Sequence, residues 1–235
     1  VVKVGIVRFP GSNCDEDAFR AVADSLGQEA VYLWHKDHDL QGVDLVILPG
    51  GFSYGDYLRP GAIARFSPIM QEVVAFANRG GLVLGICNGF QIACEAGLLP
   101  GALLRNASLR FVSAPVHLRV ESIATPFTSQ YHVGQVLRVP IAHGDGRFTA
   151  DADTLERMEG EGQIVFRYVN ADGEATDTAN PNGSQRHIAG IINAAGNVMG
   201  MMPHPERAMD LGLGSTDGVG VFVSVLGLGL VQAVK

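Results

Sequence analysis

The sequence predicts a single α/β domain: a mainly parallel sheet flanked by helices, with an added region of antiparallel strands. Two observations lead to this fold class. Through the first hundred residues, short runs of Val, Ile and Leu alternate with segments of helical period, and these runs lack the polar alternation of a half-solvated strand. From about Leu103 onwards, apolar runs follow one another with polar turns between them, which is typical of antiparallel pairing.

Apolar runs and breaker residues place the elements of the parallel region. The expected strands cover residues 2–7, 30–34, 43–48 and 82–86. The expected helices cover residues 15–26, 63–77 and 90–95. Gly27 and Gly80-Gly81 end the first two helices, and Phe66 belongs to the apolar stripe of the second. Helices between strands supply the long crossovers that a parallel sheet needs.

The later strands are expected to be shorter and antiparallel. Valines and leucines between Leu103 and Val139 suggest the first of them, and others are expected at residues 165–169, 188–192 and 198–202. A final helix is expected to start near Ser215-Thr216-Asp217, which suit an N-cap. Its apolar stripe is Val219, Phe222, Val223, Leu226 and Leu230. A second apolar face predicts packing against a neighbouring subunit and consists of Val221, Val225 and Leu228.

Length and composition fit one ordered domain covering residues 1–235. The chain is 47% hydrophobic and 17% charged, whereas a disordered chain would have fewer apolar residues and more charge. A formal charge of −7 argues against binding to nucleic acid or to an anionic membrane surface. The uncharged stretch 218–234 contains four glycines and is shorter than the roughly 20 residues that a membrane span needs.

The three cysteines are Cys14, Cys87 and Cys94. An odd number without paired spacing does not describe a disulfide framework, and no C-x-x-C pattern is present for a metal or redox site. A metal site at His35 and His38 is also disfavoured, because both stand in a polar loop that we expect to be solvated. We therefore expect no bound metal, and a reducing cytoplasm as the location.

The segment Gly85-Ile86-Cys87-Asn88-Gly89 is the most informative motif. It joins an expected buried strand to an expected helix, and its glycines permit the tight turn of a nucleophile elbow. Such a turn holds the Cys87 sulfur at a helix N-terminus, which stabilises a thiolate, and directs the N–H of Asn88 towards a developing oxyanion. A buried structural thiol is the competing interpretation, and it suits Cys94 better because Cys94 stands mid-helix.

A base for this thiol is expected in Pro203-His204-Pro205-Glu206-Arg207. Histidine is the usual base because its ordinary pKa lies near neutrality. The prolines predict an extended backbone, in which Glu206 projects to the same side as His204 and can orient its ring and stabilise the imidazolium. A surface ion pair is the alternative. Among the other histidines, His143 is a plausible binding residue because it ends an expected strand.

A glycine loop, Pro49-Gly50-Gly51-Phe52-Ser53-Tyr54-Gly55-Asp56, follows the expected strand 43–48. Gly50 and Gly51 let the backbone approach a ligand and offer N–H groups to an oxyanion. A phosphate loop is rejected, because Asp56 stands where the motif requires lysine. A dinucleotide fingerprint at Gly212-Leu213-Gly214 fails because no strand precedes it.

These three motifs, in this order and spacing, resemble the class I, triad-type glutamine amidotransferases. Further segments are similar to the glutaminase subunits of phosphoribosylformylglycinamidine synthases, which take part in the ATP-dependent amidation of formylglycinamide ribonucleotide in purine synthesis. Those segments are Arg8–Cys14, Gly50–Leu58, Gly61–Ile63, Gly85–Gln91, Gly97–Asn106, Ile141–Gly144, Asn180–Ser184 and Gly200–Arg207. His187 departs from the pattern, which has asparagine at this position.

The resemblance implies a type 1 glutamine amidotransferase domain over residues 1–235. Cys87 would form a glutamyl thioester with L-glutamine, and His204 and Glu206 would complete the catalytic triad. The Gly51 and Asn88 amides would bind the oxyanion, and Gly50, Phe52, Gln91 and the backbone around His143 would line the glutamine pocket. Ammonia would pass to a synthetase subunit that binds ATP and Mg, joined by a small third subunit. No cofactor is expected on this chain.

Two other interpretations stay open. The chain could supply ammonia to a different synthetase, which the narrower segments disfavour, or it could be a non-catalytic binding module on the same scaffold. Such modules keep an elbow cysteine without the Pro-His-Pro-Glu base, whereas this chain keeps both. Replacing Cys14 or Cys94 by alanine is expected to be much milder than replacing Cys87, because no base is predicted beside either thiol.

Overall fold

A nine-stranded mixed sheet forms the centre of the protein in the computed structural model, which describes residues 1–227. Its strand order is β2-β1-β3-β4-β11-β10-β9-β6-β7. The strands of this sheet are β1 Lys3–Arg8, β2 Glu29–Trp34, β3 Leu45–Leu48, β4 Leu82–Ile86, β6 Val112–Val120, β7 Val136–His143, β9 Ile164–Val169, β10 Ile188–Ile192 and β11 Val198–Met201. A separate antiparallel pair joins β5, Ala102–Leu104, to β8, Arg147–Thr149.

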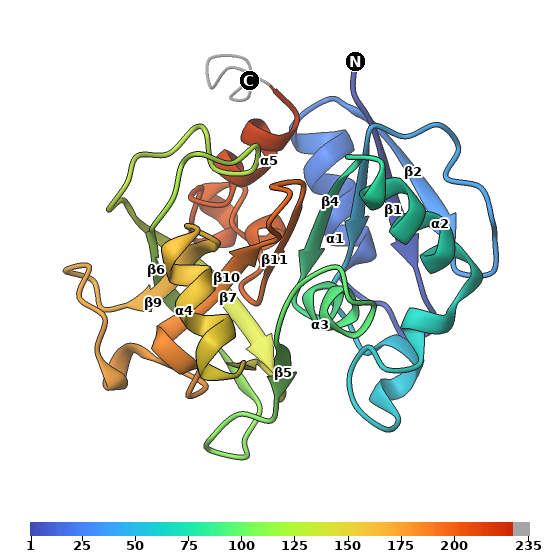
Figure 1. Cartoon of the computed structure of the whole chain (residues 1–235). Coiled ribbons are helices and arrows are strands. Elements are labelled where there is room, and N and C mark those ends of the chain that lie inside the picture. The colour runs from blue at the N-terminus through green and yellow to red at the C-terminus, as the bar shows by residue number, and fades with distance from the viewer. Residues whose placement is uncertain (228–235) are drawn as a thin grey trace.

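Parallel and antiparallel strands occupy opposite halves of this one sheet. The pairs from β2 to β11 are parallel, and those from β11 to β7 are antiparallel. Figure 1 shows the parallel half on the right and the antiparallel half on the left, with β10 and β11 between them. The predicted fold class is confirmed, but β6 and β7 are not short, since they have nine and eight residues.

Five α-helices flank the sheet within the described residues. They are α1 Asp15–Arg20, α2 Pro68–Asn78, α3 Asn88–Glu95, α4 Ala152–Gly160 and α5 Val219–Val225. A π-helical turn, Ala21–Ser25, continues α1. Among the residues up to 227, no helix is long and apolar enough to cross a membrane.

Helix α2 begins five residues later than the sequence pattern predicts. Pro68 occupies its first turn, and Ser67 before it is extended, because a residue preceding proline is disfavoured in the α region. Residues Ala64–Phe66 form a separate 3₁₀ turn. Phe66 therefore lies outside the helical stripe, and 69% of it is exposed.

Helix α5 is buried on the face that was expected to meet another subunit. Val221 and Val225 are buried within the chain, so that prediction is wrong for them. The connection before β7 packs against this helix: the Tyr131 hydroxyl donates to the Asp217 carbonyl at 2.6 Å, and the Gln130 N–H donates to the Ser224 hydroxyl at 3.0 Å. The N-cap is Gly218. Leu228 and Leu230 lie outside the described residues.

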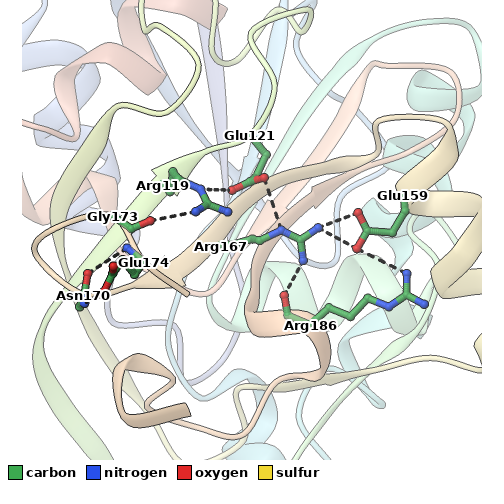
Figure 2. Close-up of polar contacts among 8 residues, drawn as sticks. All are labelled: Arg119, Glu121, Glu159, Arg167, Asn170, Gly173, Glu174 and Arg186. Carbon is green, nitrogen blue, oxygen red and sulfur yellow. Dashed lines mark hydrogen bonds and ion pairs between the residues drawn. The ribbon is translucent and has the colours of Figure 1, made fainter. Parts of the chain in front are cut away.

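Helix α4 has no counterpart in the sequence prediction. Asp151 caps it, since its carboxylate accepts the Thr154 N–H at 2.8 Å. An ion-pair network ties this helix to the antiparallel strands (Figure 2): the Arg167 guanidinium on β9 lies 2.7 Å from a Glu159 oxygen and 3.4 Å from a Glu121 oxygen. Burial would raise the pKa of Glu159, but Arg167 and Arg186 hold it below its ordinary value.

Candidate active site

Cys87 stands in a strained elbow between β4 and α3. Its φ of +50° and ψ of −106° are unfavourable for a residue with a side chain, and such strain persists only where the surroundings impose it. The Cys87 N–H donates to the Met201 carbonyl at 2.8 Å, which fixes the turn against β11. Asn88 is the first residue of α3, so its N–H has no acceptor within the helix.

Glycine is required at position 89, two residues after Cys87. A Cβ placed on Gly89 would lie 1.8 Å from the Leu48 carbonyl oxygen, a backbone atom that cannot rotate away. Helix α3 therefore packs against the end of β3 through bare backbone. This contact places the elbow close to the glycine loop that follows β3.

Replacing Gly89 by alanine should therefore destabilise the protein. Overpacking of this kind costs about 1–3 kcal/mol, which lowers the melting temperature of a chain this size by roughly 3–10 °C. Differential scanning calorimetry would measure the shift. Gly160→Ala is the matched control, because a Cβ there meets nothing within 4 Å. Equal melting temperatures for the two variants would contradict the close approach.

His204 and Glu206 form a buried pair immediately after β11. Nδ1 of His204 lies 2.6 Å from Oε1 of Glu206, and the two residues are only 1% and 3% exposed. Residues Pro205–Arg207 form a 3₁₀ turn, so the predicted extended backbone is wrong although the predicted neighbours do meet. The His204 N–H donates to the Pro140 carbonyl at 2.8 Å, which anchors the turn to β7.

The sheet register brings this pair to the thiol. Strands β4 and β11 are parallel neighbours, with Ile86 opposite Met201, so Cys87 and His204 leave the sheet at the same edge. Burial alone would lower the pKa of His204, but the Glu206 carboxylate and then Cys87 raise it well above its ordinary value. An imidazolium beside the thiol is therefore favoured. Nε2 of His204 and Oε2 of Glu206 are buried without a hydrogen-bond partner among the described residues.

Cys14 is a second thiol beside His204, contrary to the prediction that it has no base nearby. Its Sγ lies 3.1 Å from Nη2 of Arg207, and ligand atoms of Cys14, His204 and Glu206 all lie within 4.8 Å of one another. A thiol, an imidazole and a carboxylate could together ligate a metal ion. However, Nδ1 of His204 and Oε1 of Glu206 are already hydrogen-bonded to each other. Burial raises the pKa of Cys14, although His204 and Arg207 oppose the shift, so Cys14 is favoured as a neutral thiol.

The glycine loop after β3 packs directly against these groups. A Cβ on Gly50 would lie 2.7 Å from Cε1 of His204 and 3.1 Å from Sγ of Cys14, so no side chain fits there. Gly51 has a φ of +140°, which glycine alone tolerates well. The Phe52 N–H donates to the Gly11 carbonyl at 2.9 Å and is therefore committed, while the residue as a whole is 45% exposed.

A cavity of about 210 Å³ opens at the thiol. Cys87, Gly51 and Phe52 lie in its walls together with Gln91. Nδ2 of Asn88 donates to the side-chain oxygen Oε1 of Gln91 at 2.8 Å. Nε2 of Gln91 in turn donates to the Asp145 carbonyl at 2.6 Å. This hydrogen-bonded chain fixes one wall of the cavity.

His143 also lines the cavity, but its ring is held inside the protein. Nδ1 lies 3.2 Å from the Asn106 side-chain oxygen, and a Cβ on Gly146 would touch the ring. Burial, and then the charge of His204, lowers the pKa of His143 to about 4. The ring is therefore neutral and supports the 142–146 loop. His35 is likewise buried rather than solvated, with Nδ1 2.6 Å from the Tyr54 hydroxyl, whereas His38 is exposed.

Four charged cavity residues were missed at the sequence level: Asp56, Arg105, Arg110 and Asp145. Asp56 ends the glycine loop already singled out, and Asp145 directly follows the segment Ile141–Gly144, so their neighbours were the available signal. The arginines lie in an irregular segment after β5 and carry no local pattern. Cys94 is on α3, with its sulfur directed at the Pro100 carbonyl and away from the cavity residues.

Comparisons with known proteins agree along nearly the whole chain. Residues 1–215 match the CobB/CobQ-like glutamine amidotransferase domain. The phosphoribosylformylglycinamidine synthase subunit PurQ of Chlorobaculum tepidum is 61% identical over 224 residues, 95% of this chain and 96% of that protein. PurQ of Salinibacter ruber is 59% identical over 95% of both chains. A chain in the structure of PurLQS from Thermotoga maritima superposes with a TM-score of 0.85 at 46% identity, covering 96% of this chain and 98% of that one.

Proposed function

Because this chain belongs to the CobB/CobQ-like glutamine amidotransferase family, we propose that it is the glutaminase subunit of a phosphoribosylformylglycinamidine synthase. The observation that carries the proposal is the constellation at one sheet edge: a cysteine in a strained elbow, beside a buried histidine whose ring is held by a carboxylate. The full-length similarity to PurQ proteins identifies the synthase that would use the ammonia.

Cys87 begins the reaction as a thiolate facing the His204 imidazolium. The sulfur attacks the side-chain carbonyl carbon of L-glutamine, and the oxyanion forms near the Gly51 and Asn88 amides. Nε2 of His204 gives its proton to the departing nitrogen, so that ammonia and a glutamyl thioester result. His204 then takes a proton from water, the hydroxide attacks the thioester, and glutamate leaves with the thiolate restored. Glu206 keeps the ring oriented and stabilises its charged form throughout.

The ammonia passes to partner subunits. A synthetase subunit that binds ATP and Mg would use it to amidate formylglycinamide ribonucleotide, and a small third subunit would complete the complex. The similar chain from Thermotoga maritima is part of such an assembly, PurLQS. The three free cysteines are compatible with the reducing cytoplasm in which we place the reaction.

Glutamine hydrolysis should be measured with the chain alone and after adding the synthetase and third subunit. We expect glutamine to support amidation of formylglycinamide ribonucleotide only when this chain is present, while ammonium chloride supports it without this chain. Ammonia release without amidation would indicate a glutaminase that serves another synthetase. No ammonia release in either setting would contradict the enzymatic proposal and favour a binding module.

A further inference from the structure

A second cavity, of about 90 Å³, adjoins the catalytic one and reaches the histidine rather than the thiol. Three polar residues line it beside His204: Asn13, Cys14 and Arg207. Cys87 lies instead in the wall of the first cavity. The two cavities share four wall residues, which are Gly51, Phe52, Phe111 and Ala142. The nucleophile and its base therefore border two neighbouring spaces.

The second cavity is large enough and polar enough to hold water. Its volume is well above the roughly 10–15 Å³ that one enclosed water requires, and such a water needs two to four polar partners. His204 is 1% exposed, and its Nε2 has no hydrogen-bond partner among residues 1–227, which the structure describes. Sγ of Cys14 lies within 4.8 Å of a ring nitrogen of His204. One water can bridge two groups across such a gap.

Cys14 is held as a neutral, hydrogen-bonding part of this wall. Its thiol donates to the Asn13 side-chain oxygen at 3.1 Å, and Nη2 of Arg207 donates to its sulfur at 3.1 Å. Burial raises the pKa of Cys14, so the thiol keeps its proton. The Cys14 N–H donates to the Gly50 carbonyl at 3.3 Å, which fixes the residue against the glycine loop. Cys14 therefore offers a polar contact without competing with Cys87 as a nucleophile.

The water that hydrolyses the thioester must approach His204. Nε2 gives its proton to the departing nitrogen in the first half of the reaction and takes one from water in the second. The ammonia and the water therefore occupy the same position in turn, beside this ring. The glutamyl group attached to Cys87 meanwhile occupies the first cavity, so water has to reach the ring from another side.

Resting on the function proposed above, we propose that the second cavity is the site of the hydrolytic water, with Cys14 and Asn13 as its positioning residues. The water oxygen bonds to the thioester carbon, and the electron pair of the broken C–S bond returns to Sγ of Cys87. One water proton passes to Nε2 of His204, which is neutral once ammonia has left, and the other stays with the product carboxyl group. Water thus enters beside the base, while glutamine enters through the first cavity.

Cys14→Met tests this site in the assembled complex, because methionine extends into the cavity without adding charge. We expect thioester hydrolysis to slow about 10–100-fold, as for a reactant displaced from its position, while thioester formation changes less than about 3-fold. Acid quenching within a turnover should show a burst of ammonia stoichiometric with active sites, followed by a slow phase. In steady state, kcat and KM for glutamine should fall together and leave kcat/KM unchanged.

Three further variants separate this role from a structural one. Cys14→Ser keeps a small hydrogen-bonding group and should restore most of the hydrolysis rate that Cys14→Met loses. Asn13→Leu removes the other polar contact at an exposed position and should also slow hydrolysis selectively, so it provides the test if Cys14→Met does not assemble. Cys94→Met is the matched control, because Cys94 lines neither cavity, and it should change neither step.

The two half-reactions distinguish the possible outcomes. His204 acts in both, so a variant that merely displaces its ring would slow formation and hydrolysis of the thioester together. Such parallel slowing in Cys14→Met and Asn13→Leu, or unchanged hydrolysis in both, would overturn the water site. A wild-type complex that does not use glutamine would instead overturn the proposed function, so the two failures are distinguishable.

Discussion

Replacing Cys87 by alanine is expected to lower glutamine hydrolysis by about 10⁴-fold or more, because the variant has no atom that can form the thioester. The residual site would still hold glutamine, but water would have to attack the amide directly. Ammonia-dependent synthesis by the assembled complex should survive, since the synthetase does not need this sulfur. Both rates can be measured on one preparation by supplying either glutamine or ammonium chloride.

Two other cysteine variants control for the loss of a thiol. Cys94→Ala alters the same helix but removes a sulfur that lies near the Pro100 carbonyl, so activity should remain within about 3-fold of wild type. Cys14→Ala should be milder than Cys87→Ala, although Cys14 contacts the groups around His204 and a measurable effect is expected there. Full glutamine use by Cys87→Ala, or its loss in Cys14→Ala instead, would reassign the nucleophile.

Replacing Glu206 by glutamine is expected to lower kcat roughly 10²–10⁴-fold. The change keeps the size of the side chain but removes the charge that stabilises the His204 imidazolium across a 2.6 Å hydrogen bond. Since Glu206 raises the pKa of His204, its loss should lower that pKa. The alkaline limb of the kcat/KM profile should therefore move to lower pH, which steady-state kinetics across pH would measure.

Asp17→Asn is the matched control for Glu206→Gln. Asp17 lies 3.0 Å from Arg207, next to the pair, but does not hydrogen-bond to His204. Its loss should leave both kcat and the alkaline limb close to wild type. A Glu206→Gln variant with an unshifted pH profile would show that the carboxylate contributes packing rather than charge.

Local patterns in the sequence were sufficient to predict most of the fold and the reactive thiol. The elbow at Cys87 could be predicted because a buried strand, two glycines and a helix start lie within a few residues of one another. The start of α2 could also have been predicted from local sequence, because Pro68 disfavours a helical Ser67. The apolar spacing that extends back to Phe66 instead suggested an earlier start. Helix α4 was missed despite its capping residue Asp151.

Contacts between distant segments could not be predicted in this way. Cys14 reaches His204 because its N–H bonds to the Gly50 carbonyl, and this pairing depends on the order of β1, β3 and β11 in the sheet. The apolar face of α5 indicated a partner, but the sequence does not reveal that Val221 and Val225 are buried within the chain itself. The charged lining of the cavity comes from three loops that meet only in the folded chain.

Cys87 is expected to carry the glutamyl group during turnover, and this covalent intermediate can be trapped. The assembled complex would be mixed with glutamine, quenched with acid within a turnover, digested and analysed by mass spectrometry. We predict a glutamyl adduct on the peptide that contains Cys87, and its absence when Cys87 is replaced by alanine. An adduct on the Cys14 peptide, or turnover with no adduct on any cysteine, would show that Cys87 is not the nucleophile.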